Sequence, residues 1–190
     1  MLLLGWGLAC AHVPRGASSR PAVPRELPIA VLPFRDETGS SLRRPPPKFM
    51  RDVPGPLDDP YAGVPPQAAS LLLQQRAAAE LARRGYAVVP PDQVAAALPQ
   101  PPEDALAATR AARQAGFEGP MLTGTIRRLH VTETGLLQVW LDLALIDPET
   151  ARVLWSASAR RPAKVFPAQT WQEILLDAGG PIFADAFGDL

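Results

Sequence analysis

Few residues of this chain could do chemistry at a metal ion or on a substrate. There is one cysteine, Cys10, and there are two histidines, His12 and His130. A zinc site or a nucleophile–base pair would need partners at a spacing that the sequence does not offer. A single cysteine also excludes a disulfide within the chain. We therefore expect no metal site, and we expect His130 to face solvent from a strand.

Two pairs of acidic residues, Asp36-Glu37 and Asp58-Asp59, are candidates for acid–base catalysis or calcium binding. Both pairs lie in segments that we expect to be loops, where carboxylates are ordinarily solvated. The glycines between Gly119 and Gly124 do not have the spacing of a phosphate-binding loop. The sequence thus predicts no catalytic residue, no cofactor and no small-molecule substrate, and we expect that the protein is not an enzyme.

Cys10 has another chemistry available, because it ends an apolar run over positions 1–9. The run is far shorter than the roughly 20 residues of a membrane-spanning helix, so it fits the apolar core of a signal peptide. Gly7-Leu8-Ala9-Cys10 resembles a lipobox, although leucine is usual at Gly7. No basic residue precedes the run, which indicates a native start upstream. We predict a signal peptide over residues 1–10 and acylation of Cys10; the alternative is a free thiol in an apolar N-terminal segment.

Charge and composition limit the function of the remaining residues. The chain has 19 basic and 19 acidic residues, so it has no surplus of positive charge to hold a polyanion. Nucleic-acid binding is therefore disfavoured, since its affinity comes mainly from neutralised phosphates. The apolar content of 47% is enough for one core, and the length fits one domain of about 100 to 200 residues with appendages.

Proline content divides the chain after Cys10. Residues 11–27 are rich in Pro, Gly and Ser and are predicted to form a flexible tether. The domain then covers residues 28–190 and begins with the apolar run 29–34, a buried strand that should end or lie at an edge at Pro33. Residues 39–66 form a long Pro-rich loop, because they sustain no hydrophobic periodicity.

Helical patterns follow this loop. A helix that begins near Pro66 carries four residues at spacings of three and four on one face: Ser70, Leu73, Ala77 and Leu81. Gly85 is the expected left-handed stop of this helix. Two shorter helices are predicted over residues 91–98 and 103–115, and Gly116 caps the second.

The carboxy-terminal segment is predicted to hold one more amphipathic helix. Its apolar positions are Phe166, Trp171, Ile174, Leu175 and Ala178. Gly179-Gly180-Pro181 should break this helix, so that the apolar residues after it fold back on the domain.

The second half of the chain reads mainly as strands. Strands are predicted over 86–89, 121–131, 136–146 and 152–159, and the last three should form an antiparallel meander through compact turns. The run 136–146 places Leu137, Val139, Leu141, Leu143 and Leu145 on one face. The other face carries Trp140, with Leu136 and Ile146. It is a second candidate for a partner-binding surface, but we expect a helix to pack on it. We predict a single mixed α/β sandwich domain, with a mixed sheet of about five strands that ends in the meander and is packed by three to four helices.

The long loop over 39–66 contains the candidate binding residues. Basic, aromatic and methionine side chains of this kind are enriched in protein interfaces. The candidates for binding a protein partner are Arg43, Arg44, Phe49, Met50 and Tyr61. The alternative is a variable surface loop that covers the sheet edge and contacts no partner.

Four sequence blocks resemble a superfamily of bacterial envelope lipoproteins: IAVLPF (29–34), ELARRGYAVV (80–89), MLTGTI (121–126) and LALIDPETARVLW (143–155). The superfamily includes the penicillin-binding-protein activator lipoproteins, the curli secretion lipoprotein, lipoproteins related to a neisserial surface antigen and the amino-terminal domain of the Tol-Pal β-propeller protein. Its members are non-enzymatic anchors, activators or secretion-pore subunits, which is what the resemblance implies here. Ala151 stands where the family commonly has glycine, which predicts a turn without a left-handed residue.

These observations predict a membrane-anchored envelope lipoprotein, a non-catalytic module that binds another envelope protein or its own copies. We expect it at the outer membrane facing the periplasm, because Ala11 replaces the aspartate that retains such lipoproteins at the inner membrane in enteric bacteria. The alternative is a subunit of an outer-membrane secretion complex, which would need alternating segments of about nine to eleven residues outside the core sheet. An uncharacterised enzyme is the third possibility.

Overall fold

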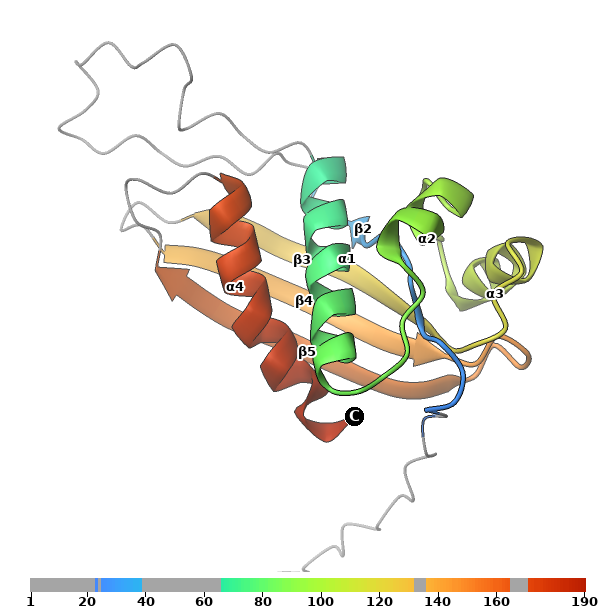
Figure 1. Ribbon diagram of the computed structural model, residues 1–190. Helices are drawn as coiled ribbons and strands as arrows, with labels where there is room; N and C mark the ends of the chain where they lie inside the picture. Colours follow the sequence, from blue (N-terminus) through green and yellow to red (C-terminus); the bar gives the residue numbers. More distant parts are fainter. Residues whose placement is uncertain (1–22, 24, 39–65, 132–135, 165–170) are drawn as a thin grey trace, which may run out of the picture.

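A computed structural model describes residues 23, 25–38, 66–131, 136–164 and 171–190. These residues form a mixed five-stranded sheet with helices on both faces, which confirms the predicted mixed fold (Figure 1). The strands are β1 (Ala30–Val31), β2 (Arg35–Asp36), β3 (Met121–Val131), β4 (Leu136–Ile146) and β5 (Val153–Lys164). Their order is β1-β3-β4-β5, and β2 also pairs with β3.

The antiparallel meander β3-β4-β5 is the main part of the sheet, as predicted. The bounds of β3 and β4 agree with the expected ones, whereas β5 continues past Ala159 to Lys164. Its last residues pair with the start of β4, so that Arg160 lies opposite Trp140 and Lys164 lies opposite Leu136. Charged residues and Pro162 are well tolerated there because β5 is an edge strand.

The expected strand over 29–34 is two short strands that run parallel to β3. The break falls around Pro33, which has no amide hydrogen to donate. Two buried polar side chains of the first helix bond to carbonyl groups of this segment: Ser70 Oγ donates to Phe34 O at 2.6 Å, and Gln74 Nε2 donates to Val31 O at 2.7 Å. These bonds satisfy carbonyls that the interrupted ladder leaves unpaired.

The predicted strand over 86–89 is wrong as a full strand. The structure has a single parallel bridge there, between Ile29 and Val88. Ile29 N donates to Ala87 O at 2.8 Å, and Val89 N donates to Ile29 O at 3.0 Å. The segment pairs only with the short stretch before β1, so the ladder cannot extend further.

Two long helices cover one face of the sheet, α1 (Pro66–Arg83) and α4 (Trp171–Ala186), and a 3-10 helix, η2 (Phe187–Asp189), follows α4 (Figure 1). As predicted, α1 ends just before Gly85, which has a φ of 84°. The apolar cluster beneath these helices contains the leucines of β4 together with Phe34, Phe183 and Phe187. Within the described part, no helix combines the length and apolarity needed to cross a membrane.

The predicted break of the last helix at Gly179-Gly180-Pro181 is wrong, because α4 continues through it. The two glycines face α1: a Cβ at Gly179 would lie 2.9 Å from Arg76 Cγ, and one at Gly180 would meet the guanidinium end of the same side chain. Glycine therefore allows the two helices to approach closely here. The packing of α4 on α1 outweighs the low helix propensity of these residues.

Two short helices, α2 (Pro91–Ala97) and α3 (Ala105–Gln114), cover only one end of the other face of the sheet. The bounds of α3 are shorter than predicted, because Asp104 is its N-cap and accepts a hydrogen bond from Ala107 N at 2.7 Å. These helices bury a second apolar cluster: Ala30, Leu32, Val94, Ala108, Ala112, Phe117, Met121 and Ile146. Beyond this cluster, no described helix covers the outer face of β3, β4 and β5.

Arg84 and Glu80 join the end of α1 to the carboxy terminus. The Arg84 guanidinium donates to Phe187 O and Ala184 O, each at 2.6 Å, and its Nε donates to Glu80 Oε1 at 3.0 Å. Arg83 also donates to Glu80, and this bond, with the smaller effect of Arg84, lowers the pKa of the Glu80 carboxyl from its ordinary value. The Glu80 side chain is only 8% exposed and that of Arg84 is 26% exposed, so water screens their contact less than the contact of Glu80 with Arg83, which is 66% exposed.

The β4–β5 turn corrects a prediction, because Ala151 has a φ of 57° and is left-handed. The turn is closed by Ala151 N, which donates to Asp147 O at 2.9 Å, and by Asp147 N, which donates to Arg152 O at 2.9 Å. These bonds hold Ala151 in a conformation that an L-residue with a Cβ adopts at a cost.

Replacing Ala151 with glycine should raise the free energy of unfolding by about 0.5–1 kcal/mol, because glycine adopts this conformation without the steric cost. Urea denaturation of the full chain measures the change. Ala79→Gly, at an exposed position in the middle of α1, is the control and should lower stability by about 1 kcal/mol. An equal loss of unfolding free energy in both variants would contradict the steric cost assigned to the left-handed conformation of Ala151.

Glu80→Gln should lower the free energy of unfolding by about 1–2 kcal/mol near pH 7, because it removes a charge-assisted contact to two arginines. A carboxyl with a lowered pKa stabilises the fold above its unfolded pKa, and this contribution is lost as the pH falls through the folded pKa. The difference between wild type and variant should therefore shrink below about pH 4. Thermal melts between pH 3 and about pH 7 test this, with exposed Glu118→Gln as the control; a difference that is independent of pH contradicts it.

Candidate functional site

The residues predicted to be acylated or to bind a partner lie outside the described residues. This applies to Cys10, His12, Asp58, Asp59, Arg43, Arg44, Phe49, Met50 and Tyr61. The described candidates are His130, Asp36 and Glu37. His130 lies on β3 with its side chain exposed, as predicted.

Asp36 and Glu37, at the end of β2, contact different partners. Asp36 Oδ1 accepts hydrogen bonds from Thr38 N at 2.7 Å and from Thr38 Oγ1 at 2.6 Å. Glu37 forms ion pairs with Arg35 and Arg127. Asp36 Oδ2 is buried and has no hydrogen-bond partner among the described residues. Over the same residues, no three His, Cys, Asp or Glu side chains are grouped so that they could hold a metal ion.

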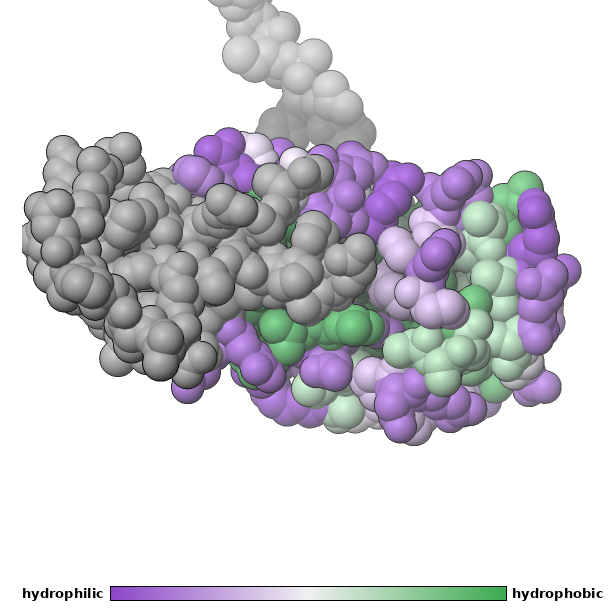
Figure 2. All heavy atoms as spheres, turned by 90° about the horizontal axis from the view of Figure 1, so that it is seen from above, coloured by the Kyte–Doolittle hydropathy of each residue, from purple (hydrophilic) through white to green (hydrophobic). Residues whose placement is uncertain are grey.

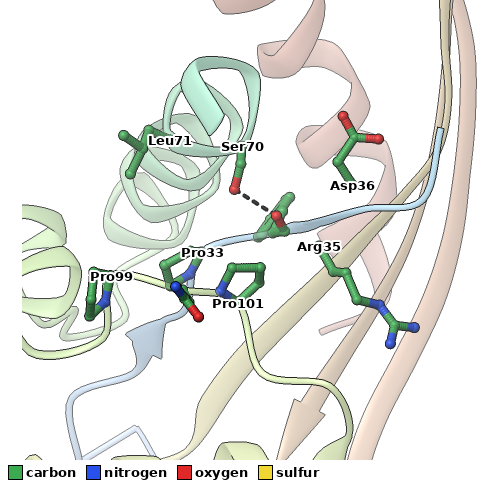
Figure 3. Close-up of a pocket in the computed structure, with 9 residues that line it drawn as sticks. Pro33, Arg35, Asp36, Ser70, Leu71, Pro99 and Pro101 are labelled. Carbon is green, nitrogen blue, oxygen red and sulfur yellow. Dashed lines mark hydrogen bonds between the residues drawn. The ribbon is translucent and has the colours of Figure 1, made fainter. Parts of the chain in front are cut away.

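A pocket of about 600 Å³ lies beside β2 and the start of α1. Figure 3 shows Pro33, Pro99 and Pro101 on one side of it, with Arg35 and Asp36 pointing in different directions from the strand. The Ser70 hydroxyl is already bonded to Phe34 O, and Arg35 Nη1 donates to Glu103 O at 2.7 Å. The pocket therefore presents rigid proline rings to a ligand and has no activated nucleophile.

Apolar side chains reach the surface near this pocket. Seen from above, the described surface is mainly hydrophilic, but a pale hydrophobic area lies over the end formed by the alanine-rich helices α2 and α3 (Figure 2). Leu71, which lines the pocket, is 40% exposed, and Leu106 of α3 is 59% exposed. Scattered apolar residues of this kind are common on protein surfaces.

The outer face of the meander carries a network of polar side chains around Asp142. Ser158 Oγ donates to Asp142 Oδ1 at 2.7 Å, and Arg127 Nε donates to Asp142 Oδ2 at 2.7 Å. The Ser158 bond, followed by the Arg127 bond, lowers the pKa of the Asp142 carboxyl. Asp142 is therefore an ionised acceptor rather than a proton donor at neutral pH.

Next to this network, Trp140 lies between two arginines from the neighbouring strands. The Cζ atoms of Arg128 on β3 and Arg160 on β5 each lie 5.0 Å from the Trp140 ring centroid. Both arginines pair directly with Trp140 across the sheet. We call these three residues the Arg–Trp–Arg row. The expected packing of a helix on Trp140 is wrong, since α2 and α3 are short and reach only as far as Ile146.

A shallow groove of about 440 Å³ continues along the same face beyond the row. Most of its lining residues have short side chains, so the sheet surface is hollowed there. They are Thr123, Thr125, Asp142, Leu143, Ala144, Ser156, Ala157 and Ser158. Four hydroxyls and one carboxylate thus line the recess; the Ser158 and Thr123 hydroxyls already donate to Asp142 and to Ala144 O, and all of these groups can accept hydrogen bonds.

Of this site, only Trp140 was a candidate from the sequence; the two arginines beside it and the groove were not identified. The signal that could have found them is the alternation of β4, which places Trp140 and Asp142 on the face opposite the leucines. Their partners on β3 and β5 depend on the strand register, which includes a shift between Ile126 and Arg128. The sequence does not reveal that register.

Comparisons with known proteins identify the fold but no family. No family model matches this chain, and no curated relative matches it. A variant of PelC from Paraburkholderia phytofirmans, solved as a dodecamer, is 20% identical over 90% of this chain and 93% of that one, with a TM-score of 0.53. Lipoprotein GNA1162 from Neisseria meningitidis is 17% identical over 84% of this chain and 99% of that one, with a TM-score of 0.48.

The carboxy-terminal domain of LpoB from Salmonella enterica also matches, at 14% identity over 73% of this chain and 84% of that one, with a TM-score of 0.38. Of these similar structures, GNA1162 is a lipoprotein. At identities below 25%, the likeness concerns the fold. This chain has the fold of PelC.

Proposed function

We propose that this chain is a lipid-anchored envelope lipoprotein whose domain is a non-catalytic module for binding and assembly. The observation that carries the proposal is the likeness of fold to PelC over 90% of this chain, because PelC is solved as a dodecamer. A domain that assembles in many copies must bind neighbouring copies through its surface. The occurrence of lipoproteins among the similar structures supports an envelope location.

The state of the acidic side chains supports a non-catalytic role. Glu37, Glu80 and Asp142 each accept a hydrogen bond or ion pair from an arginine. The pKa of Glu80 is lowered mainly by Arg83, and the pKa of Asp142 is lowered first by the Ser158 hydroxyl and then by Arg127, so both remain ionised at neutral pH. A general acid needs a raised pKa, so neither Glu80 nor Asp142 is suited to donate a proton in catalysis.

The proposed anchor is an acylated Cys10, and residues 11–27 are the proposed tether. A flexible chain of that length spans roughly 20–25 Å on average, so the domain would remain close to the membrane surface. We place the protein at the outer membrane, facing the periplasm. Two or three acyl chains suffice for stable anchoring, since each buried methylene contributes about 0.8 kcal/mol.

Cells that express the chain and are fed a clickable fatty acid should incorporate the label into the wild-type protein. Cys10→Ser should abolish labelling and move the protein from the membrane to the soluble fraction, because the thiol is the acyl acceptor. A gel of labelled proteins and a membrane fractionation measure the two effects. Fatty-acid labelling that persists in Cys10→Ser would contradict the proposal that Cys10 is the anchor.

Partner recognition is proposed for Arg43, Arg44, Phe49, Met50 and Tyr61. Replacing Arg43, Arg44, Phe49 and Tyr61 together should remove the crosslinked partner, or the crosslinked second copy, while the thermal midpoint stays within about 1 °C of wild type. Crosslinking in intact cells followed by mass spectrometry identifies what is attached. Matched replacement of exposed Arg110 and Gln114 on α3 is the control. Unchanged crosslinks in the loop variant contradict the role of these residues.

A further inference from the structure

On the outer face of the meander, the cationic Arg–Trp–Arg row lies directly beside the polar groove. Along β4, Trp140 and Asp142 are two residues apart on one face, and along β5, Arg160 and Ser158 are their partners. Successive rows of side chains on one face are roughly 7 Å apart. The Arg–Trp–Arg row and the groove therefore form one continuous surface across three strands.

Trp140 positions the two arginines of the row, and Arg160 also interacts electrostatically with Asp142. Neither Arg128 nor Arg160 forms an ion pair or hydrogen bond with another described residue, and both are exposed. His130 and Lys164, also exposed, lie on the same face at the same end of the sheet. A guanidinium stacked on an aromatic ring keeps its N–H fork available, and the ring restricts its motion. Such groups are suited to bind carboxylates in a bidentate manner.

Whereas the arginines donate hydrogen bonds, the groove supplies hydrogen-bond acceptors. Asp142 is ionised, and its two oxygens keep lone pairs beyond the bonds to Ser158 and Arg127. The hydroxyls of Thr125 and Ser156 lie around it and can donate or accept, while the Thr123 hydroxyl donates to Ala144 O at 3.3 Å and can accept. A ligand that brings hydroxyl groups to this groove and acid groups to the arginines would use both parts of the surface.

We infer that this face binds an acidic polysaccharide, a chain of sugars that carry carboxylates. Sugar hydroxyls would donate to Asp142 in the groove, while carboxylates would accept from Arg128 and Arg160. A flat anionic membrane surface would not enter the groove and would be repelled by Asp142. An acidic peptide ordinarily adds to a sheet at its edge through backbone hydrogen bonds rather than across its face.

The neutral net charge of the chain does not oppose this inference, because net charge does not report where the charges lie. The inference is also independent of the lipid anchor and of assembly in several copies. Its failure would leave the results of acyl labelling and crosslinking unchanged.

Isothermal titration of the full chain carrying Cys10→Ser, at fixed ionic strength, tests the inference with polygalacturonate as the acidic polysaccharide. Polygalacturonate should bind, and the neutral polysaccharide dextran should bind at least about tenfold more weakly. Arg128→Gln and Arg160→Gln should each weaken binding by about tenfold, which corresponds to the loss of one charge-assisted contact. Arg110→Gln removes an exposed arginine on α3 and should change affinity less than about twofold.

Asp142→Asn separates sugar recognition from general attraction between charges. The variant makes the face more positive, so a purely electrostatic site would bind polygalacturonate more tightly. Recognition of sugar hydroxyls predicts weaker binding, because the amide loses one acceptor oxygen. A thermal melt of each variant verifies that the domain is folded.

Four results would overturn the inference. They are no binding of polygalacturonate, equal binding of polyglutamate, equal binding of phosphatidylglycerol vesicles, and tighter binding by Asp142→Asn. Equal binding of polyglutamate would assign the face to acidic proteins, and equal binding of vesicles would assign it to anionic lipids.

Discussion

The contact between the leucine face of β4 and the helices α1 and α4 determines the arrangement of the molecule. β4 is the central strand of the meander, and its inner residues from Leu137 to Leu145 are buried in one cluster with residues of both helices. Because side chains alternate along a strand, burial of this face also decides which residues point the other way. The outward position of Trp140 and Asp142 is therefore a consequence of the core, and so is the surface that they form with β3 and β5.

Much of the fold could be predicted from local pattern, and the errors have physical causes. The bounds of β3 and β4 and the end of α1 at Gly85 follow from periodicity and from a left-handed glycine, which are local properties. The path of α4 through Gly179-Gly180-Pro181 depends on the approach of Arg76 from another helix. Local propensity gives no information about that contact, and it also misled at Ala151, where backbone hydrogen bonds of the turn impose a left-handed residue.

The candidate site was less predictable than the fold. The sequence places Arg128, Trp140 and Arg160 far apart, and only the register of two antiparallel pairs brings them together. The expectation that a helix covers Trp140 rested on the general tendency of apolar sheet faces to be covered. Here α2 and α3 are too short to do so, and two guanidinium groups occupy the space beside the ring instead. The residues proposed from the loop over 39–66 remain a prediction.

Assembly and ligand binding would reinforce each other in this architecture. A single face with two exposed arginines and a shallow groove offers few contacts, so one copy would bind a polymer weakly. If the domain assembles in several copies, as proposed, identical faces are held at fixed distances, and a long polymer can occupy several of them at once. The second and later contacts then form at a high effective concentration, which can strengthen the overall affinity by about 10² to 10⁴. A weak site on each copy is therefore compatible with firm retention of a polysaccharide, and it would allow each segment of the polymer to exchange rapidly.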